Sequence, residues 1–228
     1  FMAGLIAGRD AALDAPYAAA PASAYRGMAP DARIVSLKVG VADGGVDVSQ
    51  VIAAIAWVVQ HKDDNGPNIR VLNLSYGTDA TQAYGVDPLA FAVEQAWNAG
   101  IVVIAASGNE GFVRHTGSIT NPARDPLILA VGATDSEGTP TMADDTTPAF
   151  SASGSPGGRL PDLSAPGAHL QGLRVPGSYL DANNPEGRIG SRYFRGSGTS
   201  QAAAILSGAA ALIIDQRPSI KPDQVKSL

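Results

Sequence analysis

The sequence predicts an α/β fold in which a mostly parallel sheet lies between layers of helices. Nearly continuous apolar runs, as at residues 101–105 and 127–131, are typical of strands that are buried on both faces. Helical patterns alternate with these runs along the chain, as they do in βαβ units. The 228 residues contain no internal repeat and no convincing domain boundary, so we expect one domain with a substantial core.

The first part of the chain is expected to contain two helices, a loop and a strand. Residues 1–8 are small and apolar and favour a helix, whereas the Ala- and Pro-rich residues 10–30 favour a loop. Apolar side chains alternate with others along residues 34–39, which predicts a strand. A broad apolar face predicts a helix at residues 49–60, with Ser49 as its N-cap.

The second part continues the alternation and then becomes irregular. We expect a strand at residues 71–74, a helix at 88–99, and strands at 101–105 and 127–131. These three strands and the one at residues 34–39 should be parallel neighbours in one sheet, with both helices covering its faces. Residues 134–195 are rich in Gly, Pro, Ser and Asp, which predicts short strands and surface loops.

Composition excludes several function classes. The formal net charge is −5 and no long basic run occurs, which argues against nucleic acid as a partner. Because the chain has no cysteine, disulfides and thiolate chemistry are excluded. No apolar stretch reaches the roughly 18 residues of a membrane span, so we expect no membrane partner. The oligomeric state cannot be read from the sequence.

One serine stands out because of the segments on either side of it. Gly196-Ser197-Gly198-Thr199-Ser200 leads directly into the alanine-rich run at residues 201–212. A hydroxyl at the start of a helix faces free N–H groups and the positive end of the helix dipole, which favour developing negative charge. Ser200 is therefore a candidate nucleophile. The alternative is an ordinary Thr or Ser N-cap before a core helix.

Other segments form an ordered set with this motif. They read Val-Leu-Asn-Leu-Ser-Tyr-Gly at 71–77, Ala-Ala-Ser-Gly-Asn-Glu-Gly at 105–111, Leu-Ala-Val-Gly-Ala-Thr-Asp at 129–135, and Pro-Asp-Leu-Ser-Ala-Pro-Gly at 161–167. In this order and spacing the chain resembles the subtilisin-like serine proteases, or subtilases, over nearly its whole length. The resemblance implies the three-layer subtilisin-like fold and a single peptidase domain at residues 1–228, truncated at both ends.

The resemblance also implies a role for each candidate residue. Ser200 would be the nucleophile of a Ser-His-Asp endopeptidase acting on polypeptides, and the Asn109 side chain would donate to the oxyanion. For Asn109 the alternative is a turn residue, since Asn tolerates left-handed conformations. Two segments flank the substrate in this family. Gly44, Gly45 and Val46 match one of them, and Ser75, Tyr76 and Gly77 match the other. Ser107 and Gly108, just before Asn109, are further substrate-binding candidates. Any single one of them could instead be an ordinary turn or strand-end residue.

Two members of the catalytic triad are not in this chain. Phe1-Met2-Ala3-Gly4 matches the family's segment just after the catalytic histidine, so that histidine and the aspartate would precede Phe1. His61, His115 and His169 match no catalytic position, and we interpret them as solvated histidines. We therefore interpret the chain as an internal fragment of a longer protease and expect it to be essentially inactive alone.

The resemblance implies no cofactor for the chemistry and an extracellular location. Many subtilases bind structural calcium, but the sequence does not support such a site. Asp10 and Asp14 are spread among alanines, and Asp144 and Asp145 lie elsewhere, so we interpret all four as solvated loop charges.

Two other classes of function remain open. A non-catalytic protein with the same fold could bind peptides or assemble with partners. Another kind of serine hydrolase is disfavoured, because Gln201 and Ala202 follow Ser200 without the glycine of a Gly-x-Ser-x-Gly elbow. Dinucleotide binding is weaker still, because Gly196 and Gly198 lack the third glycine of that fingerprint.

Overall fold

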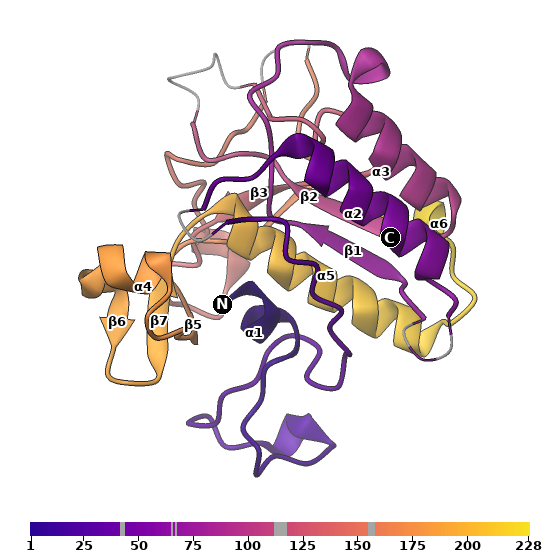
Figure 1. Ribbon diagram of the computed structural model, residues 1–228. Coiled ribbons are helices and arrows are strands. Elements are labelled where there is room, and N and C mark those ends of the chain that lie inside the picture. The colour runs from indigo at the N-terminus through magenta and orange to yellow at the C-terminus, as the bar shows by residue number, and fades with distance from the viewer. Residues whose placement is uncertain (42–43, 65, 67, 112–117, 155–157) are drawn as a thin grey trace.

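A four-stranded parallel sheet forms the centre of the structure, a computed structural model that describes all residues except 42–43, 65, 67, 112–117 and 155–157 (Figure 1). Its strands are β1 (Val71–Leu74), β2 (Val102–Ala106), β3 (Leu129–Thr134) and β4 (Leu163–Pro166), in that spatial order. Leu72 lies opposite Val103, and Ala105 lies opposite Ala130. The predicted α/β class with a mostly parallel sheet is confirmed.

Helices cover both faces of this sheet. In Figure 1, α2 (Val48–His61) and α3 (Pro88–Asn98) lie side by side on one face, and α5 (Thr199–Gln216) crosses the other. The short α1 (Met2–Ala7) packs against α5, and α6 (Pro222–Lys226) contacts β2. All five residues of β2 are consequently buried, so β2 is the centre of the core.

Acidic side chains cap the two helices on the α2–α3 face. Asp47 accepts a hydrogen bond from the Ser49 N–H at 2.8 Å, so the predicted N-cap Ser49 is wrong by two residues. Asp87 accepts from the N–H groups of Leu89 and Ala90, with a proline at the first helical position. Both arrangements satisfy N–H groups that have no partner within the helix.

A small antiparallel sheet lies within the region predicted as short strands and loops. Its strands are β5 (Leu170–Leu173), β6 (Arg188–Ile189) and β7 (Tyr193–Gly196), in the order β5-β7-β6, with α4 (Tyr179–Asn183) between β5 and β6 in the chain. Asp181 accepts hydrogen bonds from Arg174 and Arg188, which hold the pKa of that carboxyl well below its usual range. The buried Asp181 carboxylate therefore joins Arg174, just after β5, to Arg188 at the start of β6. Single 3-10 turns complete the structure at Tyr17–Ala19, Tyr84–Val86, Met142–Asp144 and Pro185–Gly187.

Most predicted elements agree with the structure within two or three residues. The strand at 71–74 is found as predicted, and β2 begins one residue later than expected. The strand predicted at 127–131 begins at Leu129, because the Leu127 N–H is bonded to the Asp125 carboxylate at 2.8 Å and belongs to a turn.

The strand predicted at residues 34–39 is wrong. These residues pair with no strand in the described chain, and Ile34 and Val35 remain 44% and 43% exposed. A strand forms only where a neighbouring backbone supplies its hydrogen-bond partners, and none of the described strands lies beside this segment. The alternating pattern is therefore present without the pairing that it normally accompanies.

Among the described residues, no helix combines the length and apolar character needed to cross a membrane.

Candidate active site

The carboxyl ends of β1 and β2 meet the first turn of α5. Ser75, one residue beyond β1, donates a hydrogen bond from its hydroxyl to the Ser200 carbonyl oxygen at 2.9 Å. Gly108, just beyond β2, donates its backbone N–H to the Thr199 hydroxyl oxygen at 3.2 Å. Segments more than 90 residues apart in the chain are thus joined at the expected edge of a parallel sheet.

Asn109 is held against the start of α5 through its side-chain oxygen. That oxygen accepts hydrogen bonds from the Thr199 N–H at 2.8 Å and from the Thr199 hydroxyl at 3.1 Å. Both partners are donors here, which assigns the oxygen end of the amide to Thr199. The Asn109 Nδ2 group has no hydrogen-bond partner among the described residues, so its donors are free.

Ser200 is the second residue of α5, not its first or its cap. The N-cap is Gly198, which has no side chain, so the alternative of a Ser or Thr N-cap does not apply. The Ser200 side chain is partly exposed, and neither its hydroxyl nor its N–H makes a hydrogen bond with any described residue. Both groups lie at the positive end of an 18-residue helix.

Thr199 is a positioning residue that the sequence reasoning missed. It is fully buried, and its hydroxyl accepts from Gly108 while donating to Asn109. Thr199 therefore holds the Asn109 amide at the start of α5, one residue before Ser200. Its place before a candidate nucleophile was the available signal, but the motif was interpreted through Ser200 alone.

Thr120 lies between Gly77 and Ser107, two of the predicted substrate-binding residues, and was also missed. Its N–H and hydroxyl donate to the Ser107 carbonyl oxygen at 2.9 and 3.3 Å. On its other side it lies so close to Gly77 that a Cβ atom there would come within 2.3 Å of the Thr120 hydroxyl oxygen. Gly77 is therefore required by close approach. No sequence motif pointed to Thr120, because only the fold brings it between these segments.

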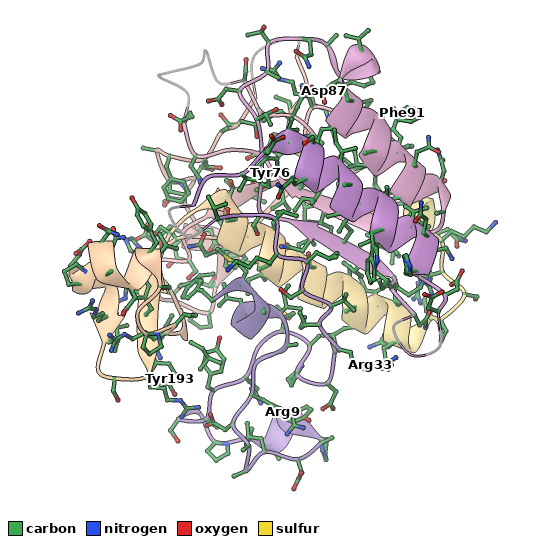
Figure 2. All side chains as sticks on the ribbon, in the orientation of Figure 1. Arg9, Arg33, Tyr76, Asp87, Phe91 and Tyr193 are labelled. Carbon is green, nitrogen blue, oxygen red and sulfur yellow. The ribbon has the colours of Figure 1, made fainter. Side chains whose placement is uncertain are left out.

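The remaining predicted substrate-binding residues differ in exposure. Gly44 and Gly45 are exposed, and Gly44 has a φ of 90°, which favours glycine. Val46 and Tyr76 are half-buried and pack against the same central core. Figure 2 labels Tyr76 beside the first turn of α2, and partial burial raises the pKa of its hydroxyl, with a smaller contribution from Asp47.

Ser107 is the predicted substrate-binding residue that is least accessible. Its side chain is fully buried, and its hydroxyl has no hydrogen-bond partner within the described part of the chain. Its carbonyl oxygen is taken by Thr120. A substrate contact at Ser107 stays a prediction, while the exposed part of this segment is Gly108 and Asn109.

Neither described histidine contacts Ser200. His61 stacks on Trp57 with the ring centroids 4.4 Å apart, and its Nδ1 lies 2.8 Å from the Trp57 carbonyl oxygen. His169 lies beyond β4, with Nδ1 2.9 Å from an Asp135 carboxylate oxygen and a largely exposed ring. His115 lies outside the described residues.

The predicted loop carboxylates have other partners where the structure describes them. Asp10 accepts hydrogen bonds from the Tyr25 N–H and from Arg192, so it is ion-paired and not the solvated charge that was predicted. Asp144 accepts from the Thr139 hydroxyl at 2.9 and 3.0 Å. Within the described parts of the chain, no three His, Asp or Glu side chains are grouped as a metal site requires.

Comparisons with known proteins agree on one family. Residues 1–228 match the subtilase family, Peptidase_S8. Serine protease AprX from Bacillus subtilis (strain 168) is 40% identical over 209 residues, which are 90% of this chain and 47% of that protein. Subtilisin E from the same strain is 32% identical over 205 residues, which are 88% of this chain and 43% of that protein. The chain thus spans about half the length of these relatives.

Solved structures show the same fold. Sphericase superposes with a TM-score of 0.71 at 25% identity and covers 90% of this chain and 61% of its own. A cold adapted subtilisin-like serine proteinase superposes with a TM-score of 0.68 at 27% identity and covers 100% of this chain and 64% of its own.

Proposed function

This chain belongs to the subtilase family, and we propose that it is one peptidase domain, truncated at both ends, of a longer serine endopeptidase. Ser200 is the nucleophile in this proposal, and the oxyanion donors are Asn109 Nδ2 and the Ser200 N–H. The observation that carries it is the pair of hydrogen bonds from Thr199 to the Asn109 oxygen. They leave the amide nitrogen free beside the residue that precedes Ser200.

The chemistry follows from these groups. The Ser200 hydroxyl adds to the carbonyl carbon of a peptide bond while a base accepts its proton. The carbonyl oxygen becomes an oxyanion, which the two N–H donors stabilise because they are already oriented. When the intermediate collapses, the amine leaves with the proton from the base, and water then hydrolyses the acyl-enzyme. The base and the carboxylate that orients it are assigned to residues preceding Phe1, as the subtilase resemblance implies.

Polypeptides are the proposed substrates, and an extended peptide is expected to bind along two predicted segments. Gly44, Gly45 and Val46 form one, and Ser75, Tyr76 and Gly77 form the other; Gly108 contributes beside Asn109. Main-chain hydrogen bonds supply affinity in such recognition, and side-chain pockets supply selectivity. We further propose that the protein acts outside the cell and needs no cofactor for the chemistry.

The test uses the full-length protein and a chromogenic peptide. Ser200→Ala should reduce turnover by about 10⁶-fold, which is the effect known for the serine of subtilisin itself. Ser219→Ala, in the exposed turn after α5, is the matched control and should leave turnover unchanged. A serine-directed phosphonate should label the parent protein and the control at Ser200 but not the Ser200→Ala variant.

A second candidate is a non-catalytic subtilase-fold protein that binds peptides or partners. The observation that favours it is that both described histidines have partners other than Ser200. A full-length protein that neither hydrolyses peptides nor reacts with the phosphonate would support this candidate over the peptidase. Robust Ser200-dependent turnover by the 228-residue chain alone would instead mean that one of its own histidines acts as the base.

A further inference from the structure

Residues 174–196, which contain α4, β6 and β7, carry four arginines that differ in what their side chains contact. Three of them are paired with carboxylates, Arg174 and Arg188 with Asp181 and Arg192 with Asp10. Arg195 is exposed, and its guanidinium makes no hydrogen bond or ion pair with any described residue. Its partner across the strands is the neutral Gln171. The Arg195 guanidinium is therefore available to a carboxylate of another molecule.

Arg195 lies on the strand that leads directly to the candidate nucleophile. β7 ends at Gly196, and Gly198 is the N-cap of α5, whose second residue is Ser200. Three residues of fully extended chain span at most about 11 Å, so the Cα atoms of Arg195 and Gly198 lie within that distance. A long cationic side chain thus stands at one rim of the candidate active site.

The predicted substrate-binding segments adjoin α5 at another place. Ser75 is hydrogen-bonded to the Ser200 carbonyl oxygen, which puts residues 75–77 against the first turn of α5. In Figure 2 the labelled Tyr76 and the labelled Tyr193 of β7 lie on different sides of the start of α5. A peptide with one half along residues 44–46 and 75–77 would therefore direct its other half past β7.

The order of product release indicates which half lies on each side. The acyl half stays bonded to the serine until water arrives, whereas the amine half must leave first. The half held along two backbone segments is retained longer, so we assign it to the acyl side. The amine half then lies on the side of β7 and Arg195.

The two sides carry opposite charges. Residues 44–47 and 75–79 include two exposed carboxylates, Asp47 and Asp79, and no Lys or Arg. Residues 174–196 carry four arginines against two carboxylates, Asp181 and Glu186, in a chain whose net charge is −5. An acidic substrate side chain is therefore repelled on the first side and attracted on the second.

We propose that Arg195 is a specificity-determining residue that selects polypeptides with Asp or Glu in the amine half, near the bond that is cleaved. A guanidinium and a carboxylate can form two parallel hydrogen bonds, which gives this contact a preferred geometry. The inference rests on the proposed peptidase function and deepens it by naming a substrate class. Because Arg195 is exposed, its effect on selectivity is moderate.

The first experiment uses the full-length protein and internally quenched peptides. They share one sequence and carry Glu, Gln or Lys at successive positions on either side of the cleaved bond, which mass spectrometry of the products identifies. In the amine half, kcat/KM should be about 2- to 5-fold higher for Glu than for Gln, and lower for Lys, as expected of an exposed ion pair. Glu in the acyl half should give no gain. A gain in the acyl half only, or no gain at any position, would overturn the proposal.

Charge reversal at Arg195 tests whether this side chain is responsible. Arg195→Glu should reverse the order so that Lys is preferred to Glu, and Arg195→Gln should remove the order. Arg217→Glu is the matched control, because it makes the same change at the exposed C-cap of α5, about 25 Å along the helix from Ser200. It should retain the preference for Glu. Thermal unfolding establishes that all three variants fold, and an unchanged preference in Arg195→Glu would contradict the proposal.

A binding measurement separates a failure of this inference from a failure of the proposed function. The affinity of full-length Ser200→Ala for fluorescent versions of the same peptides should follow the order Glu, Gln, Lys, and Arg195→Glu should reverse it in that background. Raising the salt from about 0.05 to 0.5 M should remove most of the difference, since exposed charges are screened. This order without turnover by the parent protein would support the role of Arg195 and contradict the peptidase. Turnover without this order would contradict the role of Arg195 alone.

Discussion

Around the junction of β2 and α5, buried residues from distant segments are hydrogen-bonded to one another. On the outer side of β1, by contrast, the strand and residues 33–39 line a hollow of about 920 Å³. Thr199 is fully buried, and its hydroxyl pairs with both Gly108 and Asn109. Ile34 and Val35 belong to the alternating pattern of a strand but remain more than 40% exposed. The difference shows that a strand pattern determines structure only when the neighbouring strand is present to pair with it.

The comparison is sharpest for two isoleucines. Ile104 in β2 is fully buried, and Ile104→Ala should lower the free energy of unfolding of the full-length protein by about 2–5 kcal/mol. In the 228-residue chain, Ile34→Ala should change it by less than about 1 kcal/mol, because the side chain is 44% exposed. Urea unfolding of each variant measures both values. Equal losses for the two variants would contradict this difference in burial.

Asn109 tests whether the closed junction serves catalysis. Asn109→Ala removes the free amide donors, and in the full-length protein it should lower kcat by about 10²–10³-fold with little change in KM, the effect of such a donor in subtilisin. Steady-state kinetics on a chromogenic peptide checks this. An unchanged kcat would leave Asn109 as a turn residue only, and Asn184→Ala, on the distant α4 side, is the matched control.

Gly77 tests how tightly the junction is packed. Gly77→Ala places a Cβ atom 2.3 Å from the Thr120 hydroxyl oxygen and should lower the free energy of unfolding by about 1–3 kcal/mol. Combining it with Thr120→Gly should recover part of that loss, because the clashing side chain is gone. Thermal unfolding of the four proteins in this double-mutant cycle measures the coupling, and strict additivity would exclude the predicted contact.

Substitution of Asp125 should have a smaller effect on stability, with a defined pH dependence. Burial, together with the nearby Glu94 carboxylate, raises the pKa of Asp125 to about 6. An Asp in the unfolded chain has a pKa near 3.9, so the folded state binds this proton more tightly than the unfolded state. The protonated Asp125 carboxyl therefore stabilises the folded state at low pH, and this contribution is lost as the pH rises from about 4 through 6. Asp125→Asn retains an oxygen for the Leu127 N–H.

The Asp125→Asn variant should thus be more stable than the parent chain by about 1–2 kcal/mol at pH 8 and equal to it near pH 4. Urea unfolding at these two pH values checks the difference. A gain that is the same at both pH values would assign the effect to packing rather than to ionisation.

The sequence by itself determined the class of fold, the central strands and the main helices. Apolar runs such as residues 101–105 need no knowledge of their neighbours, because any strand that is apolar on both sides must be buried on both faces. The motif around Ser200 was equally readable, since a helix start and its preceding glycines are local features. The roles of Ser200 and Asn109 stay predictions that the proposed experiments test.

Only the tertiary structure decided which side chains complete the site and where the sheet is open. Thr199 and Thr120 became visible because they touch residues tens of positions away, and a hydrogen bond between distant segments leaves no periodic signal in the chain. The strand expected at residues 34–39 failed for the same reason. Alternation specifies a face, but pairing depends on a second backbone that this segment's own sequence does not contain.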